Sequence, residues 1–286
     1  MSTPPSAITV LTRSNPSQTA DALRRVVEIA VSEGVEVRVP PEEVAKHRLE
    51  PRDGVTLGAE ATDPTDLALV LGGDGTILST LRTYAGRDVP VFAITYGAIG
   101  FLSTVEHEEL ERGVRQALAG EFDVMELPAL TVQPEEREYL AVNDISFHRR
   151  PEGRVAELSY SVEHEQLGSV RCDGLVVSTP AGSTGYNLAN GGPVLAWGVE
   201  GFVVSFIAPH TLTARALVVA PDSVLEVTNR SSEEPAEMTT DGRGVGALAP
   251  QASVRIRFDE QHTLLAQAPG ATFYGRLREK FGRLAY

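Results

Sequence analysis

The spacing of apolar residues along the chain changes near Phe122. Before that point, continuous apolar runs alternate with segments of helical periodicity. The runs, which we expect to be buried strands, are residues 7–11, 35–39, 66–71 and 89–95. The periodic segments, which we expect to be helices, are residues 17–33, 77–84 and 106–119. Strands that alternate with helices predict a Rossmann-like α/β domain with a mostly parallel sheet.

After Phe122 the pattern has a period of two. Leu158, Tyr160 and Val162 alternate with polar neighbours, as in half-buried antiparallel strands. Further strand candidates are residues 140–148, 174–178, 202–207, 224–228, 254–258 and 263–267, and residues 272–284 are expected to be helical. The pattern predicts a β-rich C-terminal domain, with the domain boundary between residues 122 and 128.

Composition narrows the class of protein. The chain has 286 residues, of which 42% are hydrophobic and 22% charged, as in an ordinary globular protein. We see no apolar run near the ~18 residues that span a bilayer, and residues 1–10 do not resemble a signal peptide. Cys172 is the single cysteine, so an intrachain disulfide is excluded. We expect a cytoplasmic protein without a membrane partner.

The net charge of −14 argues against a nucleic-acid partner, because such a partner requires a positive surface. Lysine occurs only at Lys46 and Lys280, and arginine carries the remaining positive charge. This composition is typical either of a GC-rich genome or of adaptation to high salt, and it does not separate the two.

A glycine-rich loop follows the apolar run at residues 66–71. It reads Gly72-Gly73-Asp74-Gly75-Thr76, where a strand is expected to meet a helix. Glycines allow backbone N–H groups to approach phosphate oxygens, and a helix N-terminus adds positive charge. Asp74 would then bind Mg²⁺ or a hydroxyl group. The alternative is a tight turn in which Asp74 caps the helix.

A second cluster, residues 172–193, leads from a predicted strand into a loop dense in glycine and hydroxyl groups. Its Ser178, Thr179, Ser183, Thr184, Tyr186 and Asn187 offer donors and acceptors to a polar ligand, and the Tyr186 ring is suited to stacking on a base. An ordinary turn-rich connection is the alternative.

Three shorter features remain. Asn143 and Asp144 lie inside an apolar run, so one of them must point inward, toward a ligand or a structural hydrogen-bond network. His210 follows a predicted strand and is more often structural than catalytic in such a place. Asp241 and Gly242 form a turn signal.

Together these segments resemble the NAD kinase family, whose members use ATP or polyphosphate. The resemblance rests on the glycine–aspartate loop, residues 97–102, the Asn143-Asp144 pair, residues 173–193, residues 209–215 and Asp241-Gly242. It implies transfer of a terminal phosphate to the 2′-hydroxyl of the adenosine ribose of NAD⁺, with Mg²⁺ or another divalent metal ion.

The resemblance also implies a domain plan and a set of site residues. Residues 1–124 would form the α/β domain, joined by residues 266–286, and residues 125–265 the dinucleotide-binding domain. Asp74 would be catalytic. Gly72, Gly73, Gly75 and Thr76 would bind phosphate. The NAD-binding residues would be Asp74, Gly75, Phe101, Asn143, Asp144, Arg154, Arg171, Asp173, Thr184, Gly185, Tyr186, Asn187, Leu188 and Ala189.

The chain departs from the family pattern at several positions. Asp144 replaces a glutamate and is one methylene shorter, Gly185 replaces alanine, and Ala189 stands where serine is common. Near a helix N-terminus a carboxylate is stabilised in its charged form. We therefore expect Asp74 to have a lowered pKa and to orient the hydroxyl or the metal more than to act as a base.

Two alternatives stay open. One is a lipid or sugar kinase that shares the glycine–aspartate loop. The other is a non-catalytic NAD-binding regulator. The resemblance implies a homodimer or homotetramer, and the sequence does not decide between ATP and polyphosphate or between NAD⁺ and NADH.

Overall fold

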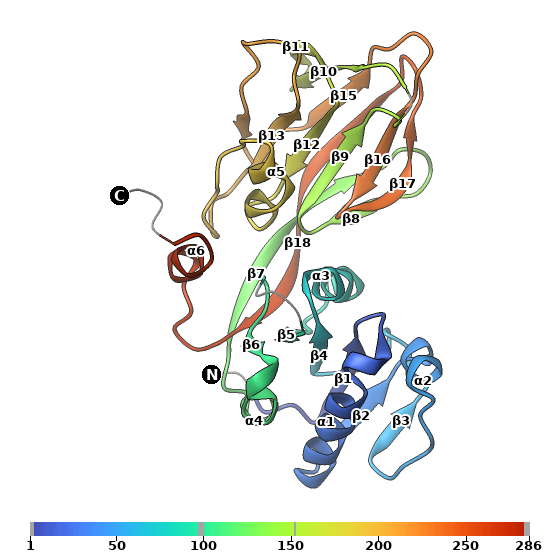
Figure 1. Ribbon diagram of the computed structural model, residues 1–286, viewed down its shortest axis with the longest axis vertical. Helices are drawn as coiled ribbons and strands as arrows, with labels where there is room; N and C mark the ends of the chain where they lie inside the picture. The colour runs from blue at the N-terminus through green and yellow to red at the C-terminus, as the bar shows by residue number, and fades with distance from the viewer. Residues whose placement is uncertain (1–2, 97–99, 152, 283–286) are drawn as a thin grey trace. The chain divides into compact units, whose positions relative to one another are not determined.

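The computed structural model describes residues 3–96, 100–151 and 153–282 (Figure 1). The chain forms two compact units. Unit 1 consists of Met1–Glu126 and Thr263–Tyr286, and unit 2 of Leu127–His262. Two long strands, β7 (Asp123–Val132) and β18 (Ser253–Gln267), contribute residues to both units.

Unit 1 has the alternating strands and helices that the apolar pattern predicts. Its strands are β1 (Ala7–Thr12), β2 (Glu36–Val39), β3 (Val55–Leu57), β4 (Leu67–Gly72), β5 (Val91–Thr95) and β6 (Val105–Glu106). Its helices are α1 (Ala20–Ser32), α2 (Pro41–His47), α3 (Asp74–Thr83), α4 (Leu110–Leu118) and α6 (Phe273–Phe281), with 3-10 turns η1 (Pro16–Gln18) and η2 (His107–Glu109).

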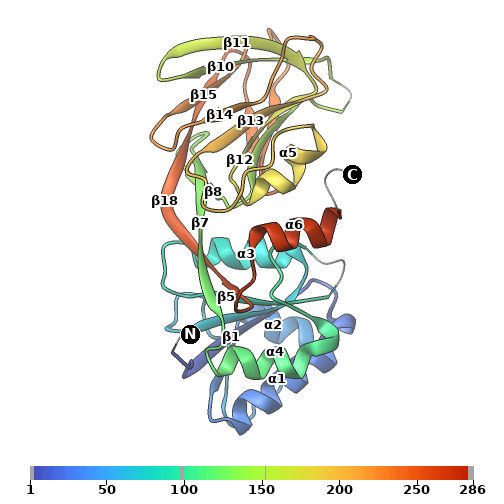
Figure 2. The ribbon, with the colours of Figure 1, turned by 90° about the vertical axis from the view of Figure 1, so that its left-hand side faces the viewer.

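The sheet of unit 1 is parallel, in the order β18-β5-β4-β1-β2-β3, and β6 pairs with β5. Helices α1 and α4 cover one face and α3 lies on the other (Figure 2). The chain passes from β1 to β2 on one side and returns to β4 on the other, so the strand order reverses between β1 and β4. Ligands of open α/β sheets bind at the carboxyl ends of the strands at such a point.

Two parts of the predicted pattern are wrong in detail. The helix expected to begin at residue 17 begins at Ala20, because Pro16–Gln18 forms a 3-10 turn in which the Asn15 side chain accepts the Ser17 N–H. Helix α2 and strand β3 were not predicted. The sequence of α2, Pro-Glu-Glu-Val-Ala-Lys-His, has no apolar stripe, so its periodicity carries no signal.

Unit 2 is antiparallel and β-rich, as predicted. Its further strands are β8 (Tyr139–Ala141), β9 (Asp144–His148), β10 (Ala156–Val162), β11 (Glu165–Cys172), β12 (Gly174–Ser178), β13 (Phe202–Ile207), β14 (Leu217–Val219), β15 (Leu225–Asn229), β16 (Ala236–Thr240) and β17 (Arg243–Leu248). It also contains the turn η3 (Gly182–Thr184) and the short helix α5 (Tyr186–Ala189).

The core of unit 2 lies between two layers of strands. One layer has the order β11-β10-β15-β18, and the other β14-β13-β12-β9-β16-β17. Alternate residues such as Leu158 and Val227 of the first layer pack with Phe147, Leu175 and Val204 of the second, and all five are fully buried. Within the described ranges, none of the helices is long and apolar enough to cross a bilayer.

Candidate active site

The glycine loop joins β4 to α3 at the carboxyl edge of the parallel sheet. β4 is buried along its whole length, Leu67–Gly72. Gly73 is the N-cap of α3, and Asp74 is the first residue of the helix. The first N–H groups of a helix have no partner inside it, and they carry the positive end of the helix dipole. This junction is therefore suited to a phosphate group.

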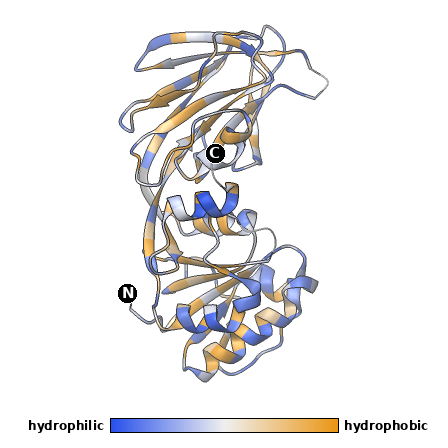
Figure 3. Cartoon of the chain, turned by 60° about the vertical axis from the view of Figure 1, so that its left-hand side comes forward, coloured by the Kyte–Doolittle hydropathy of each residue, from blue (hydrophilic) through white to orange (hydrophobic). Residues whose placement is uncertain are grey.

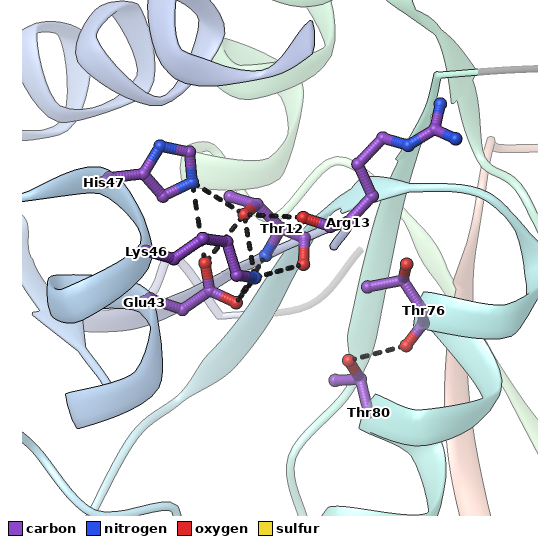
Figure 4. A network of polar contacts seen from close by, with 7 residues as sticks. All are labelled: Thr12, Arg13, Glu43, Lys46, His47, Thr76 and Thr80. Carbon is purple, nitrogen blue, oxygen red and sulfur yellow. Dashed lines mark hydrogen bonds and ion pairs between the residues drawn. The ribbon is translucent and has the colours of Figure 1, made fainter. Parts of the chain in front are cut away.

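The other residues of the loop differ in exposure. Gly72 is buried, and a Cβ built there would lie 2.7 Å from the Thr76 hydroxyl, so the glycine lets Thr76 pack back against the strand. Gly75 is exposed in the first turn of α3. The Thr76 carbonyl accepts a hydrogen bond from the Thr80 hydroxyl at 3.0 Å (Figure 4).

Arg13 brings a cation to the same edge of the sheet. Its backbone N–H donates to the Leu71 carbonyl at 3.0 Å, and its guanidinium donates to the Tyr96 carbonyl at 2.7 Å. The Tyr96 N–H donates in turn to the Gly72 carbonyl at 3.2 Å. Arg13 is thus hydrogen-bonded to β4 directly, at Leu71, and indirectly, through Tyr96, at Gly72. The sequence interpretation missed it, although a basic residue directly after the first strand was the available signal.

A buried polar network fixes the end of β1 next to this loop (Figure 4). The Glu43 carboxylate, whose residue is 3% exposed, accepts the Thr12 N–H at 3.1 Å and the Thr12 hydroxyl at 2.7 Å. Lys46 pairs with Glu43 at 2.6 Å, and the His47 Nε2 lies 2.8 Å from the Thr12 hydroxyl. Burial lowers the pKa of His47. A buried carboxylate requires such partners, and Thr12 is held beside Leu71 by strand pairing.

Asp74 lies in an environment that corrects two expectations. Gly73 is the N-cap of α3, and Asp74, already inside the helix, does not cap it. Burial raises the pKa of Asp74, and this effect outweighs the lowering by Lys280, Arg276 and a hydrogen bond from the Phe101 N–H. The expected lowered pKa is therefore wrong, because loss of hydration at the carboxylate exceeds the stabilisation from its neighbours.

Gly100 and Phe101 form the surface against which the Asp74 carboxylate packs. A Cβ built on Gly100 would overlap the carboxylate, so a glycine is required there by close approach. Phe101 is buried, with its ring centroid 6.2 Å from that of Phe273 and 5.8 Å from that of Phe281. Its side chain serves packing, and its backbone faces Asp74. Residues 97–99 of the predicted segment 97–102 lie outside the described residues.

In unit 2, the Asp241 carboxylate binds three consecutive backbone N–H groups. It accepts from Val142 at 3.1 Å, from Asn143 at 2.7 Å and from Asp144 at 3.1 Å. The run at residues 140–148 is therefore not one strand, because it breaks between β8 and β9 where Asp241 binds it. Asp241, in the turn before β17, is a positioning residue; the sequence interpretation used it as a turn signal and as part of the family resemblance, without this role.

Asp144 is 7% exposed, and burial followed by repulsion from Asp241 raises its pKa to about 7. Its carboxyl group is therefore partly protonated near neutral pH, and the protonated form is able to donate a hydrogen bond. Asn143, in the bend before β9, has a buried side-chain oxygen without a partner among the described residues.

Tyr186 packs on His148 in the same region of unit 2. Its ring stacks on His148, with centroids 5.7 Å apart and an angle of 21°. Burial raises the pKa of Tyr186, and the charges of Asp144 and Asp173 add to this rise. Asp173 also pairs with Arg149 at 2.6 Å. The structure thus adds His148, which lies on β9 with Asp144 and stacks on the predicted Tyr186.

Several loop side chains expected to meet a ligand instead hold the loop together. Thr179 donates to the Val142 carbonyl at 2.6 Å, and Ser183 donates to the Pro180 carbonyl at 2.7 Å. The Asn187 amide donates to the Ser183 and Pro193 carbonyls, each at 2.9 Å, and its side chain is fully buried. The hydroxyls of this loop are therefore partly structural, and a coenzyme contact of Asn187 stays a prediction.

The remaining predicted residues lie nearer the surface of unit 2. Gly185 and Ala189 are exposed, and Thr184 and Leu188 are half-buried. Arg154, in the loop before β10, and Arg171, on β11, are both exposed. The exposed His210 donates its N–H to the Arg171 carbonyl at 2.7 Å.

The described residues hold no group of three or more His, Cys, Asp or Glu side chains arranged to bind a metal ion. Mg²⁺ in phosphoryl-transfer sites is usually held by one or two carboxylates together with substrate phosphates. Asp74, beside a loop suited to phosphate, fits that smaller donor set.

Two family models match the chain in order. The ATP-NAD kinase N-terminal domain matches residues 8–122, and the ATP-NAD kinase C-terminal domain matches residues 142–267. The chain belongs to the NAD kinase family. The family resemblance inferred from the motifs is therefore confirmed, and so are the α/β and β-rich fold classes.

Relatives within the family support the same assignment. The chain is 37% identical to the NAD kinase of Gemmatimonas aurantiaca, over 77% of this chain and 78% of the relative. It is 33% identical to the NAD kinase of Geobacter sp. strain M21, over 89% and 91%.

Solved structures share the fold. Yeast NADH kinase complexed with NADH has a TM-score of 0.87 at 21% identity, covering 99% of this chain and 91% of that one. An NAD kinase from Archaeoglobus fulgidus in complex with ATP has a TM-score of 0.74 at 24% identity, covering 96% and 97%.

Proposed function

We propose that this protein phosphorylates the 2′-hydroxyl of the adenosine ribose of NAD⁺ with ATP, giving NADP⁺ and ADP. The observation that carries the proposal is the half-buried Asp74 at a glycine-rich strand–helix junction in a chain that matches both NAD kinase domain models. Phosphoryl transfer needs positioning and charge neutralisation, and this junction offers both a carboxylate and backbone N–H groups.

Asp74 acts on the attacking hydroxyl. The 2′-oxygen forms a bond to the terminal phosphorus, the bond between that phosphorus and the bridging oxygen breaks, and the hydroxyl proton passes to Asp74. Burial raises the pKa of Asp74 toward the working pH, which makes it a better general base than an exposed aspartate. Gly72, Gly73, Gly75 and Thr76 frame the N–H groups that receive the donor phosphates.

A divalent metal ion, which we propose to be Mg²⁺, would be held by Asp74 together with the donor phosphates and would neutralise their charge. Because the described residues provide no larger carboxylate cluster, we expect the ion to bind tightly only when the nucleotide is present.

Unit 2 recognises the coenzyme. Asn143 and Asp144 hold the adenosine part, and the Asp241 carboxylate fixes both residues by accepting their N–H groups. Asp173, Thr184, Gly185, Tyr186, Asn187, Leu188 and Ala189 form the dinucleotide loop, and Arg154 and Arg171 contribute positive charge. Gly75 and Phe101 of unit 1 stay predicted coenzyme contacts.

A coupled assay tests the proposal. Purified protein is given NAD⁺ and ATP with Mg²⁺, and NADP⁺ is followed with an NADP⁺-specific dehydrogenase. Parallel reactions replace ATP by polyphosphate and NAD⁺ by NADH, because the chain leaves both choices open. We expect NADP⁺ with ATP, and loss of the signal when EDTA removes the metal. NAD⁺ binding without NADP⁺ formation would instead identify a non-catalytic regulator.

Two other expectations stay predictions. We expect a homodimer or homotetramer, which light scattering of the purified protein measures. The cytoplasmic location inferred from the single cysteine also stays a prediction.

A further inference from the structure

Helix α6 brings two cations toward Asp74. Thr272 caps the helix by accepting the Gly275 N–H at 3.0 Å, and Phe273 and Leu277 are its buried residues. Figure 3 shows this last helix as largely hydrophilic, because Arg276, Arg278, Glu279 and Lys280 follow one another along it. Arg276 and Lys280 are the two of these residues whose charge acts on Asp74.

Arg276 is held in place by two backbone carbonyls. Its Nη1 donates to the Phe101 carbonyl at 2.9 Å and to the Ser103 carbonyl at 2.5 Å. Burial lowers the pKa of Arg276, whereas Glu279 and Asp74 raise it. A partly buried, planar guanidinium that is hydrogen-bonded to two carbonyl oxygens has little freedom to rotate. Its charge therefore stays beside Asp74.

Phe101 joins the three charged groups. Its N–H donates to the Asp74 carboxylate and its carbonyl accepts from Arg276, so one residue connects the carboxylate with the guanidinium. The Lys280 ammonium lies 5.5 Å from the centroid of the Phe101 ring. Asp74 thus packs against a short backbone segment, Gly100 and Phe101, whose position α6 secures.

This arrangement meets a need of the reaction. Negative charge in phosphoryl transfer spreads over the oxygens of the transferring group and must be neutralised. The chain has no P-loop lysine. Helix α6 instead places an arginine on the Phe101 carbonyl and a lysine over the Phe101 ring, next to the Gly100 against which the Asp74 carboxylate packs.

We propose that Arg276 and Lys280 of α6 take part in phosphoryl transfer: Arg276 positions Asp74 through Phe101, and Lys280 binds the terminal phosphate of the donor. The proposal rests on the kinase function proposed above. It assigns to the C-terminal helix a role that packing alone does not require.

Four variants test the proposal. Three change the proposed residues, namely Arg276→Gln, Arg276→Lys and Lys280→Met, and Arg278→Gln is the matched control. Arg278 lies on the same helix, is exposed, and its loss changes the net charge equally. For each variant, kcat and KM for ATP and for NAD⁺ are measured beside the thermal unfolding midpoint. ATP binding without NAD⁺ is measured by equilibrium dialysis.

We expect Arg276→Gln to lower kcat by about 10²-fold, the size seen when one preorganised electrostatic group is removed, with KM for NAD⁺ within about threefold. Arg276→Lys should recover about tenfold of that loss, since it restores the charge. Lys280→Met should weaken ATP binding by about tenfold. Arg278→Gln should stay within about twofold of the wild type.

The outcomes separate the two proposals. If Arg276→Gln and Lys280→Met match Arg278→Gln in kinetics and in ATP binding, the proposal that α6 takes part in phosphoryl transfer is wrong. If Arg276→Gln lowers kcat only together with the unfolding midpoint, and Arg276→Lys restores neither, Arg276 is structural and its assignment is overturned. If the wild type binds ATP but makes no NADP⁺, the kinase function fails, while weaker ATP binding by Lys280→Met still supports the phosphate contact.

Discussion

Asp74 in unit 1 and Asp144 in unit 2 are the two carboxylates to which we assign the main roles, and burial raises the pKa of both. Their charged neighbours differ in sign. Asp74 has Arg276 and Lys280 acting on it and lies in the first turn of a helix. Asp144 has Asp241 acting on it, and its pKa rises to about 7.

The difference shows how one residue type serves two purposes. Positive neighbours oppose the rise that burial causes in the pKa of Asp74, and so favour the charged form that receives a proton or binds a metal. Burial, to which a negative neighbour adds, raises the pKa of Asp144 to about 7, so its protonated form is able to donate a hydrogen bond to a ligand oxygen. Burial is the largest influence on the pKa of both acids, and the neighbouring charges oppose it at Asp74 and add to it at Asp144.

The largest effect is expected when the charge of Asp74, one of the two compared carboxylates, is removed. Asp74→Asn keeps the shape and removes the charge, so we expect kcat to fall by about 10²–10⁴-fold, the usual contribution of a general base. NAD⁺ binding, measured by calorimetry, should change little. Near-normal turnover of this variant would show that Asp74 is neither base nor metal ligand.

The second prediction concerns the pH dependence of stability at Asp144. Its folded pKa, about 7, lies above the ordinary 3.8, so its contribution to stability is fully present below pH 4 and is lost as pH rises through 7. We expect the contribution of this residue to the unfolding free energy to fall by about 2–4 kcal/mol between acid and pH 8. Urea unfolding of the wild type and of Asp144→Asn at several pH values measures it. Parallel curves for the two proteins would contradict the prediction.

Asp241→Asn sharpens the comparison by removing the acid that faces Asp144. Asparagine tolerates the positive φ of 46° at this turn, so the backbone is retained. Weaker acceptance of three N–H groups should cost about 1–3 kcal/mol of unfolding free energy. The pH at which stability is lost should also move downward, because the repulsion that raises the pKa of Asp144 is gone. An unchanged midpoint would mean that burial alone sets that pKa.

The smallest effect is expected at Tyr186. Tyr186→Ala removes a ring suited to stacking on a base and should weaken NAD⁺ binding by about 1 kcal/mol, or roughly fivefold. Tyr186→Phe keeps the ring and serves as the control, and we expect its affinity to match the wild type. Equal affinities for all three proteins would exclude stacking on this residue.

The periodicity of the sequence predicted most of the architecture for a physical reason. Apolar runs such as residues 66–71 must be buried on both faces, and this holds for a strand in a parallel sheet regardless of its partners. Helix α2 was missed because the residue that it buries is the polar Glu43, which binds Thr12. Its sequence therefore has no apolar stripe to indicate a helix. A local pattern reports burial of apolar groups and says nothing of buried polar ones.

The candidate site was predictable to a lesser degree. The glycine loop and residues 173–193 are recognisable in the sequence alone, because glycines and hydroxyl-bearing residues cluster there. The roles of Arg276 and Asp241 are not, since each lies far along the chain from the residues it positions; the turn signal at Asp241 gave no sign of its partners. Asn187 shows the opposite case. Its place in a polar loop suggested a ligand contact, but its buried side chain binds the backbone of the same loop.

The sequence by itself determined the α/β and β-rich character of the two parts, the strand–glycine–helix junction that carries Asp74, and membership of the NAD kinase family. These depend on residues adjacent in the chain. Only the tertiary structure decided the protonation tendencies of Asp74 and Asp144, because a pKa depends on burial and on charges that folding brings from distant segments. The helix dipole at Asp74 was visible from the sequence, but the loss of water that outweighs it appears only when the chain is folded.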